Sequence, residues 1–407
     1  MTHRVNSQKS NAVDHQPDLE NDQNGNLASL PRTVWDDSAV VSLQGTGVVM
    51  NSSQMDNTIS STIDANSVVF QRRKQCQITL FVSLFALLLI VVLLSIALGQ
   101  YYVPVQDILP ILLGGSDSAG LASSVVWEIR LPRIILGLLV GAALGVAGTL
   151  MQALFANPLA EPSIIGVTSG AGVGAALVIV FEIAILGTFT VPVAAFITAL
   201  MVTGIIYQLA RHNGRVAVVN LILTGIAINA VCGAIISFML YLAPTSNREQ
   251  IIFWQMGSLN GSQWKHVWVV LPVVVLGVVI ALRLGRKLDV LALGERAAGH
   301  TGIDVAKLRV VAIVSSTVLT AGAVSFAGLI GFVGLIVPHL LRQIVGPENR
   351  ILIPASALAG AVLIGFADIA ARTLIPFADL PIGIFTALVG GPTFFILLRR
   401  MMRKGLH

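Results

Sequence analysis

The chain has 407 residues, of which 55% are hydrophobic and only 11% are charged, and its mean hydropathy is +0.84. One soluble core could not bury that much apolar surface, so the composition excludes a soluble globular protein and predicts a membrane protein of several helices. The net charge of +5 is uneven, because residues 1–70 carry three basic against eight acidic side chains and the rest of the chain is strongly basic.

Residues 1–70 form an acidic, polar tail whose short apolar patches never lengthen into a core. Such a segment cannot bury enough surface to offset the entropy of ordering, so we expect a disordered tail. It lacks a basic start followed by an apolar run, so no secretory signal is visible. Cys76 and Cys232 lie far apart in apolar stretches and are predicted to be free thiols.

From residue 71 to residue 407 the chain alternates long uncharged runs with short charged connectors. The runs are Ile78–Leu98, Ile134–Ala160, Pro162–Phe181, Ile183–Ala210, Val216–Asn247, Val267–Leu282, Val310–Leu341, Ile351–Ala367 and Leu380–Leu398. A spanning helix needs about 20 residues, so most runs predict one span each.

The basic residues predict the orientation of these spans. Seventeen of them lie in the connectors 72–74, 211–215, 283–309, 342–350 and 399–404, whereas the alternate connectors carry only five. By the positive-inside rule the first set is cytoplasmic, and both termini are cytoplasmic with it.

This orientation requires Val310–Leu341 to cross the membrane twice, because both of its flanks are basic. A helix of that length reaches about 48 Å, short of two full spans of about 30 Å each, so one of the two helices must be short. The glycine-rich stretch 327–338, which ends at Pro338, is the predicted place of reversal. The sequence therefore predicts an all-α membrane fold of about ten membrane helices, five on each side of the 242–266 loop. Because each half has an odd number of helices, the two halves are predicted to have inverted orientations.

The stretch "ANPLAEPSIIGVTSGAGVG" (156–174) interrupts the apolar pattern at the cytoplasmic end of a predicted span. Pro158 and Pro162 each remove a backbone donor and bar a continuous helix. A packed re-entrant turn would explain the stretch, and so would a gate or docking element beside a pathway. Glu161 favours the second interpretation, because a carboxylate at membrane depth usually serves a cavity or a partner.

Four motifs together resemble the iron-chelate permease family, the membrane subunits of type II ATP-binding-cassette importers for cobalamin, haem and ferric siderophores. They are "RLPRIILGLLVGAALGVAGTLMQALFANPLAEPSIIGVTSGAGVG" (130–174), "LALGERAAGHTGID" (291–304), "GLIGFVGLIVPHLLR" (328–342) and "DLPIGIFTALVGGP" (379–392), and the resemblance extends from about residue 72 to the end. It implies a subunit of ten helices in the cytoplasmic membrane, which forms a homodimer with the pathway along its two-fold axis. It also implies two cytoplasmic ATPase subunits and an external substrate-binding protein.

The chain lacks any Gly-Lys pair and therefore a Walker loop, so we expect no enzymatic activity and no cofactor in this subunit, with ATP and magnesium used by the partner ATPase. No nucleic-acid partner is expected. The resemblance implies that the connector 291–309 couples to that ATPase; without it a plain solvated loop would be the better interpretation. The coupling candidates are Gly294, Glu295, Arg296, Ala298 and Gly302.

On the external side the resemblance implies that Arg130, Arg133 and Arg372 receive acidic residues of the binding protein, for which a guanidinium fork is well suited. Interfacial anchoring of these side chains is the alternative.

For the pathway, the resemblance places the fifth helix, about 217–242, along the dimer axis. Its candidate lining residues are Asn220, Thr224 and Asn229, with an apolar gate at Val218 and Val219 and a second inner constriction at Thr168, Ser169 and Gly170. Valines at the gate predict closure by apolar contact and dewetting. A Gly170→Leu substitution is expected to permit assembly and block passage.

The stretch "IIFWQMGSLNGSQW" (251–264) resembles haem permeases, so haem is the predicted cargo, with a ferric siderophore or cobalamin as alternatives. His339 is expected to make a structural hydrogen bond rather than to ligate iron. An ion-coupled secondary transporter is the alternative of a different class, but it normally keeps carboxylates in mid-span, and Glu161, Glu182 and Asp368 all lie toward helix ends.

Overall fold

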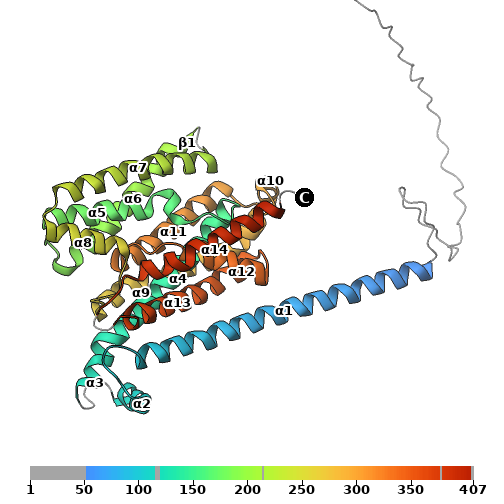
Figure 1. Cartoon of the computed structure of the whole chain (residues 1–407). Coiled ribbons are helices and arrows are strands. Elements are labelled where there is room, and N and C mark those ends of the chain that lie inside the picture. The colour runs from blue at the N-terminus through green and yellow to red at the C-terminus, as the bar shows by residue number, and fades with distance from the viewer. Residues whose placement is uncertain (1–51, 115–119, 213–214, 376–377, 405–407) are drawn as a thin grey trace, which may run out of the picture. The chain divides into compact units, whose positions relative to one another are not determined.

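The computed structural model describes residues 52–114, 120–212, 215–375 and 378–404, and these are almost entirely helical (Figure 1). The chain divides into two compact units, Met1–Val68 and Val69–His407. Most of the predicted disordered tail, residues 1–51, lies outside the described residues. Residues 52–70 are helical and not disordered, because helix α1 (Ser52–Ala97) continues through them. Once a helix is nucleated, each further residue adds a hydrogen bond at low entropic cost.

Ten apolar helices form the membrane part. Within the described residues, eight are long enough to cross a membrane and two are shorter. They are α1, α4 (Leu131–Leu154), α5 (Val167–Val180), α6 (Thr190–Ala210), α7 (Val218–Leu242), α9 (Trp264–Leu291), α11 (Val305–Ala327), α12 (Val333–Val345), α13 (Asn349–Thr373) and α14 (Ile382–Lys404). The predicted all-α membrane fold of about ten helices is confirmed.

The smaller elements lie at the helix ends. They are α2 (Val105–Gly114), α3 (Leu121–Ser124), the π-helix η1 (Val125–Arg130), the 3₁₀ turns η2 (Pro162–Ile165) and η3 (Gly187–Phe189), α8 (Thr245–Met256) and α10 (Glu295–His300). Strands β1 (Arg211–His212) and β2 (Arg215–Val216) pair antiparallel, with Arg211 opposite Val216.

The two short helices occupy the same place in each half of the chain. Helix α5 has 14 residues and is the third of the first five apolar helices, and α12 has 13 residues and is the third of the second five. Helix α11 ends at Ala327 and α12 begins at Val333, so the predicted reversal within 327–338 is confirmed. A repeated order of long and short helices with an odd number per half is the pattern expected of inverted repeats.

Helix α4 lies at the centre of the bundle because its glycines let other backbones approach closely. A Cβ at Gly141 would lie 2.2 Å from the carbonyl oxygen of Gly360 in α13, and one at Gly148 would lie 1.9 Å from the carbonyl oxygen of Gly334 in α12. Hydroxyl groups add to these contacts, because Thr149 donates to the Ser356 hydroxyl over 2.9 Å. The α4 backbone is therefore in direct contact with both helices.

The connectors lie at two ends, which we call the basic end and the opposite end. The basic end holds the start of the membrane part of α1, the β1–β2 hairpin, α10 and the start of α13. Arg73 of α1 pairs there with Glu348 over 3.1 Å, and Asp289 of α9 accepts the backbone N–H groups of Asn349 and Arg350 at the start of α13. A carboxylate at a helix N-terminus satisfies free donors and complements the helix dipole.

Candidate functional site

Two buried arginines, Arg133 and Arg372, meet two carboxylates at the opposite end. Arg133 of α4 binds Asp368 of α13 over 2.8 Å (Nε to Oδ1) and Asp379 over 3.2 Å (Nη1 to Oδ2). Arg372, one turn beyond Asp368 on the same helix, approaches its second oxygen at 3.2 Å. Asp368 is therefore shared between two guanidinium groups, which offset the cost of burying its charge.

The other guanidinium contacts hold the segment that follows α1. Arg130 donates to the backbone oxygens of Ile96, Ala97 and Tyr101, and Arg372 donates to the backbone oxygen of Leu98 over 2.9 Å. Backbone carbonyls at the end of a helix lack intrahelical donors. The two arginines supply these donors and thereby fix the first connector against α4 and α13.

The structure thus brings together all three arginines that the sequence assigned to docking, and Arg130, Arg133 and Arg372 are only 4%, 8% and 7% exposed. They line a cavity of about 230 Å³ together with Gln100, Tyr101, Asn260 and Asp379, among others. Their docking role stays a prediction. Sequence reasoning missed their pairing with Asp368 and Asp379, although buried cations require counter-charges and these two carboxylates lie in the same predicted outer region.

A second polar group joins η2, α5 and α7 toward the basic end. The Asn229 side chain of α7 donates from Nδ2 to the backbone oxygen of Ser163 over 3.1 Å and accepts from the Ser169 hydroxyl. A Cβ at Gly225, one turn earlier in α7, would lie 2.0 Å from the backbone oxygen of Ile164. The predicted pathway residues Ser169 and Asn229 are therefore in direct contact and attach α7 to the 156–174 stretch.

Glu161 lies at the turn that precedes η2, as the sequence suggested. The Ser163 hydroxyl donates to its carboxylate, while burial raises the pKa of the carboxyl above its usual range. The same short turn thus carries the Glu161–Ser163 contact and the backbone oxygen that Asn229 binds. A chain of hydrogen bonds runs from Glu161 through η2 to α7.

Gly170 faces α6. It is buried, and a Cβ there would lie 2.8 Å from the Val202 Cβ and 2.9 Å from the Thr198 carbonyl oxygen. A leucine at this position would press on the α5–α6 contact, so the expected Gly170→Leu block cannot by itself separate a gate from a packing effect. The neighbouring Thr168 is half-buried.

The remaining predicted pathway residues lie at the start of α7. Val218 and Thr224 are half-buried and Asn220 is exposed, while Val219 is 63% exposed. Val219 begins a stripe of exposed apolar side chains along α7 that continues at helical spacing through Leu223 and Ile226. This stripe is not covered by any described part of the chain, and the gate role of these residues stays a prediction.

The predicted coupling segment contains one short helix. Gly294 (φ 112°) precedes α10 and Gly302 (φ 80°) follows it, and both adopt positive backbone angles that only glycine takes readily. Ala298 is fully buried, whereas Arg296 is exposed and Glu295, also exposed, pairs with Arg309 of α11. The segment thus holds one six-residue helix set between the ends of α9 and α11.

The 251–264 segment, on which the haem prediction rested, is a structural junction. The backbone N–H of Leu329 donates to the Trp254 oxygen over 3.3 Å, that of Ser258 to the Ala327 oxygen over 2.8 Å, and that of Ile382 to the Gly257 oxygen over 2.9 Å. The segment therefore connects α8 to the start of α14 and to the reversal between α11 and α12. Whether the segment also contacts the cargo stays a prediction.

His339 of α12 lies 2.9 Å from the side-chain nitrogen of Gln343, measured from its Nε2. This contact matches the structural hydrogen bond expected of it. Within the described residues no three His, Cys, Asp or Glu side chains are grouped as a metal ion would require.

Comparison with known proteins gives a consistent set of matches. The model of the FecCD transport family matches residues 87–400. The cobalamin import system permease protein of Halobacterium salinarum is 44% identical over 281 residues, which are 68% of this chain and 74% of that protein. The hemin transport system permease protein of Yersinia pestis is 39% identical over 287 residues, or 69% and 85% of the two chains. A solved structure described as a metal-chelate type ABC transporter in an inward-facing conformation has a TM-score of 0.71 at 33% identity, and the match covers 79% of this chain and 99% of that one.

Proposed function

Because the chain belongs to the FecCD transport family and is an ABC importer permease, we propose that it carries a bulky metal chelate of the tetrapyrrole class across the cytoplasmic membrane. The observation that carries this cargo class is that the two relatives just described are named for cobalamin and for hemin, which both hold a metal in a tetrapyrrole macrocycle. An ion-coupled secondary transporter, the alternative of another class, does not fit this family.

Haem remains the predicted cargo within that class, because residues 251–264 resemble haem permeases. The 44% identity to the cobalamin permease gives cobalamin a specific observation in its favour. A ferric siderophore is the third candidate and lies outside the tetrapyrrole class.

We further propose the arrangement of partners. Two copies of the chain face each other across the exposed apolar stripe of α7, which no described part of the chain covers. Two ATPase subunits bind the basic end at α10, where Arg296 is exposed, and a substrate-binding protein docks at the opposite end beside Arg130, Arg133 and Arg372. The basic connectors then face the cytoplasm and both termini lie there. ATP and magnesium belong to the ATPase, and this subunit holds no cofactor.

Reconstitution tests this proposal. The chain is placed in proteoliposomes with its cognate ATPase and with binding protein loaded with haem, cobalamin or a ferric siderophore, and both ATP hydrolysis and uptake are measured. Uptake with haem or cobalamin alone supports the tetrapyrrole class and decides between its members. A response to the siderophore alone overturns the cargo and keeps the importer.

A matched pair of variants tests the coupling surface in the same assay. Arg296→Glu reverses an exposed charge on α10, and we expect it to lower stimulated ATP hydrolysis at least tenfold. Arg399→Glu makes the same change at an exposed position near the end of α14 and should leave the rate within about twofold of wild type. Equal effects of the two variants would contradict an ATPase contact at α10.

A further inference from the structure

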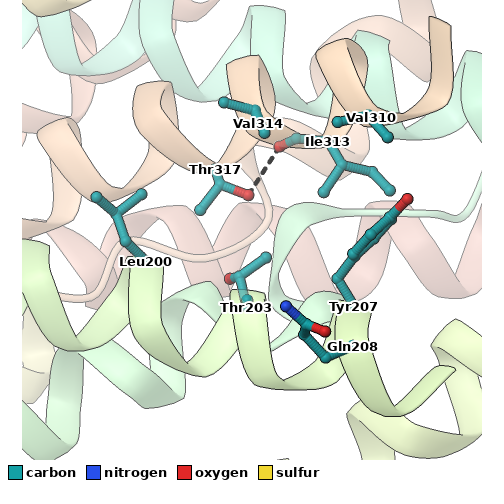
Figure 2. A pocket seen from close by; sticks show the side chains of 9 residues that line it. Leu200, Thr203, Tyr207, Gln208, Val310, Ile313, Val314 and Thr317 are labelled. Carbon is teal, nitrogen blue, oxygen red and sulfur yellow. Dashed lines mark hydrogen bonds between the residues drawn. The ribbon is translucent and has the colours of Figure 1, made fainter. Parts of the chain in front are cut away.

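An apolar groove lies between α6 and α11 in the half of the bundle nearer the basic end. Figure 2 shows its lining side chains. Its volume is about 170 Å³. Its lining residues from α6 are Leu200, Thr203, Gly204, Tyr207 and Gln208, and those from α11 are Val310, Ile313, Val314 and Thr317. No role in the transport function described above uses this groove.

The groove is apolar although two threonines line it, because their hydroxyl groups are already bonded. Thr203 donates to the Ile165 backbone oxygen over 3.2 Å, and Thr317 donates to the Ile313 backbone oxygen over 2.7 Å, the bond drawn in Figure 2. Only their methyl groups remain for contact. At Gly204 an added Cβ would meet no atom within 4 Å, so the glycine leaves open space in the wall of the groove.

The groove is open along its length and fits one leaflet of a membrane. Val314 is 53% exposed and Gly204 is exposed, so the opening faces away from the packed interior. From Leu200 to Gln208 the helix rises about 12 Å, which is most of the roughly 15 Å depth of a single hydrocarbon leaflet. An extended acyl chain that entered from the membrane would lie along both helices.

The end of the groove nearer the basic end carries cations that no described carboxylate neutralises. Lys307 precedes Val310, Val314 and Thr317 on the same face of α11, at spacings of three and four residues, and Arg211 directly follows α6; both are exposed. Arg309 is used elsewhere, because it pairs with Glu295 and donates to the Val216 backbone oxygen over 3.3 Å.

The carboxylate of Asp304, just before α11, forms no ion pair with these cations. Asp304 caps the helix by accepting the backbone N–H of Lys307 over 3.0 Å. Tyr207 adds a phenol oxygen and Gln208 an amide group to the lining of the groove (Figure 2). The site therefore combines an acyl-sized groove with two cations at the adjoining ends of the two helices that line it.

We propose that this groove binds one acyl chain of an anionic phospholipid, with its phosphate held by Arg211 and Lys307. Acyl methylene groups gain contact with Leu200, Val314 and the threonine methyls, and the phosphate gains two nearby positive charges. The α6–α11 contact is thereby completed by a specific lipid, independently of the transported cargo.

Native mass spectrometry of the full chain, released from a mild detergent, tests this proposal with phosphatidylglycerol and phosphatidylcholine as probes. Wild type is expected to retain one phosphatidylglycerol per chain at concentrations at which phosphatidylcholine is lost. Arg211→Gln and Lys307→Gln should each weaken retention about fivefold, the factor given by about 1 kcal/mol for each cation near a lipid headgroup. Gly204→Trp, which fills the groove, should abolish it.

Two controls keep the test specific. Ile205→Trp adds the same ring at a neighbouring, 42% exposed position of α6 that does not line the groove, and Arg399→Gln removes an exposed cation at another helix end. Both should retain phosphatidylglycerol as wild type does. Equal retention of the two lipids, or unchanged retention in Gly204→Trp, would overturn the proposal. Loss in Gly204→Trp with a wild-type thermal midpoint supports it, because a packing defect would lower the midpoint too.

Discussion

The arginine cluster at the opposite end yields a graded prediction, because its two carboxylates differ in burial. Asp368→Asn keeps the side-chain volume but leaves Arg133 and Arg372 without the carboxylate they share. The Asp368 side chain is 3% exposed and lies 2.8 Å from Arg133 and 3.2 Å from Arg372. Asp379→Asn removes a carboxylate that is 24% exposed and pairs once, over 3.2 Å.

The expected costs follow from these environments. Removing one partner of a buried ion pair leaves an uncompensated buried charge and costs about 3–5 kcal/mol. A partly exposed pair is screened by water and is worth at most about 1 kcal/mol. Asp368→Asn should therefore lower the unfolding free energy at least threefold more than Asp379→Asn.

Equilibrium unfolding of the purified chain in mixed micelles, titrated with SDS and followed by tryptophan fluorescence, measures both values. The reasoning is refuted if Asp379→Asn costs as much as Asp368→Asn, because burial would then not control the energetics of the cluster. The Asp379 variant also tests docking. It frees one donor of Arg133 at low cost in stability, so a role in docking predicts tighter association with the binding protein.

Three further predictions concern the 156–174 stretch and the core. Burial raises the pKa of Glu161 in the folded chain above its unfolded value of 4.5. The stability that this group contributes is therefore complete below pH 4.5 and is lost as the pH rises through the folded pKa. Glu161→Gln should flatten that decline of the unfolding free energy, measured by SDS titration at several pH values. Gly148→Ala, whose methyl would lie 1.9 Å from the Gly334 oxygen, should cost about 1–3 kcal/mol by thermal unfolding, whereas Gly204→Ala should cost little. Asn229→Ala loses its bond to η2 and should raise hydrogen exchange in residues 162–170 without global unfolding.

The sequence predicted the membrane architecture well where run length, flanking charge or proline position was enough to decide it. The run Val310–Leu341 was too short for two full spans and had basic flanks on both sides, and α12 is indeed a short helix after a reversal at 328–332. Helix α4 ends at Leu154, shortly before Pro158, and Pro162 begins η2, so no continuous helix runs through the two prolines, as expected.

Predictions that depended on side-chain direction were less complete. Gly170 was assigned to a constriction, but it faces Val202 and Thr198 of α6. The 251–264 stretch was read as a sign of the cargo, and the structure adds that its backbone connects three parts of the fold. A sequence pattern gives residue types and spacing, and neither determines which neighbour a given helix face meets.

The sequence by itself therefore determined the class of protein, the number and order of its helices and the family, because hydropathy, charge placement and motif spacing are properties of the linear chain. Only the tertiary structure decided which charged side chains pair and at which glycines the backbone of another helix packs closely. Arg133 and Asp368 are 235 residues apart, and their contact depends on the approach of α4 to α13 that the glycines allow. Such contacts arise from packing in three dimensions, where the energy of a buried group is set by neighbours that are distant in the chain.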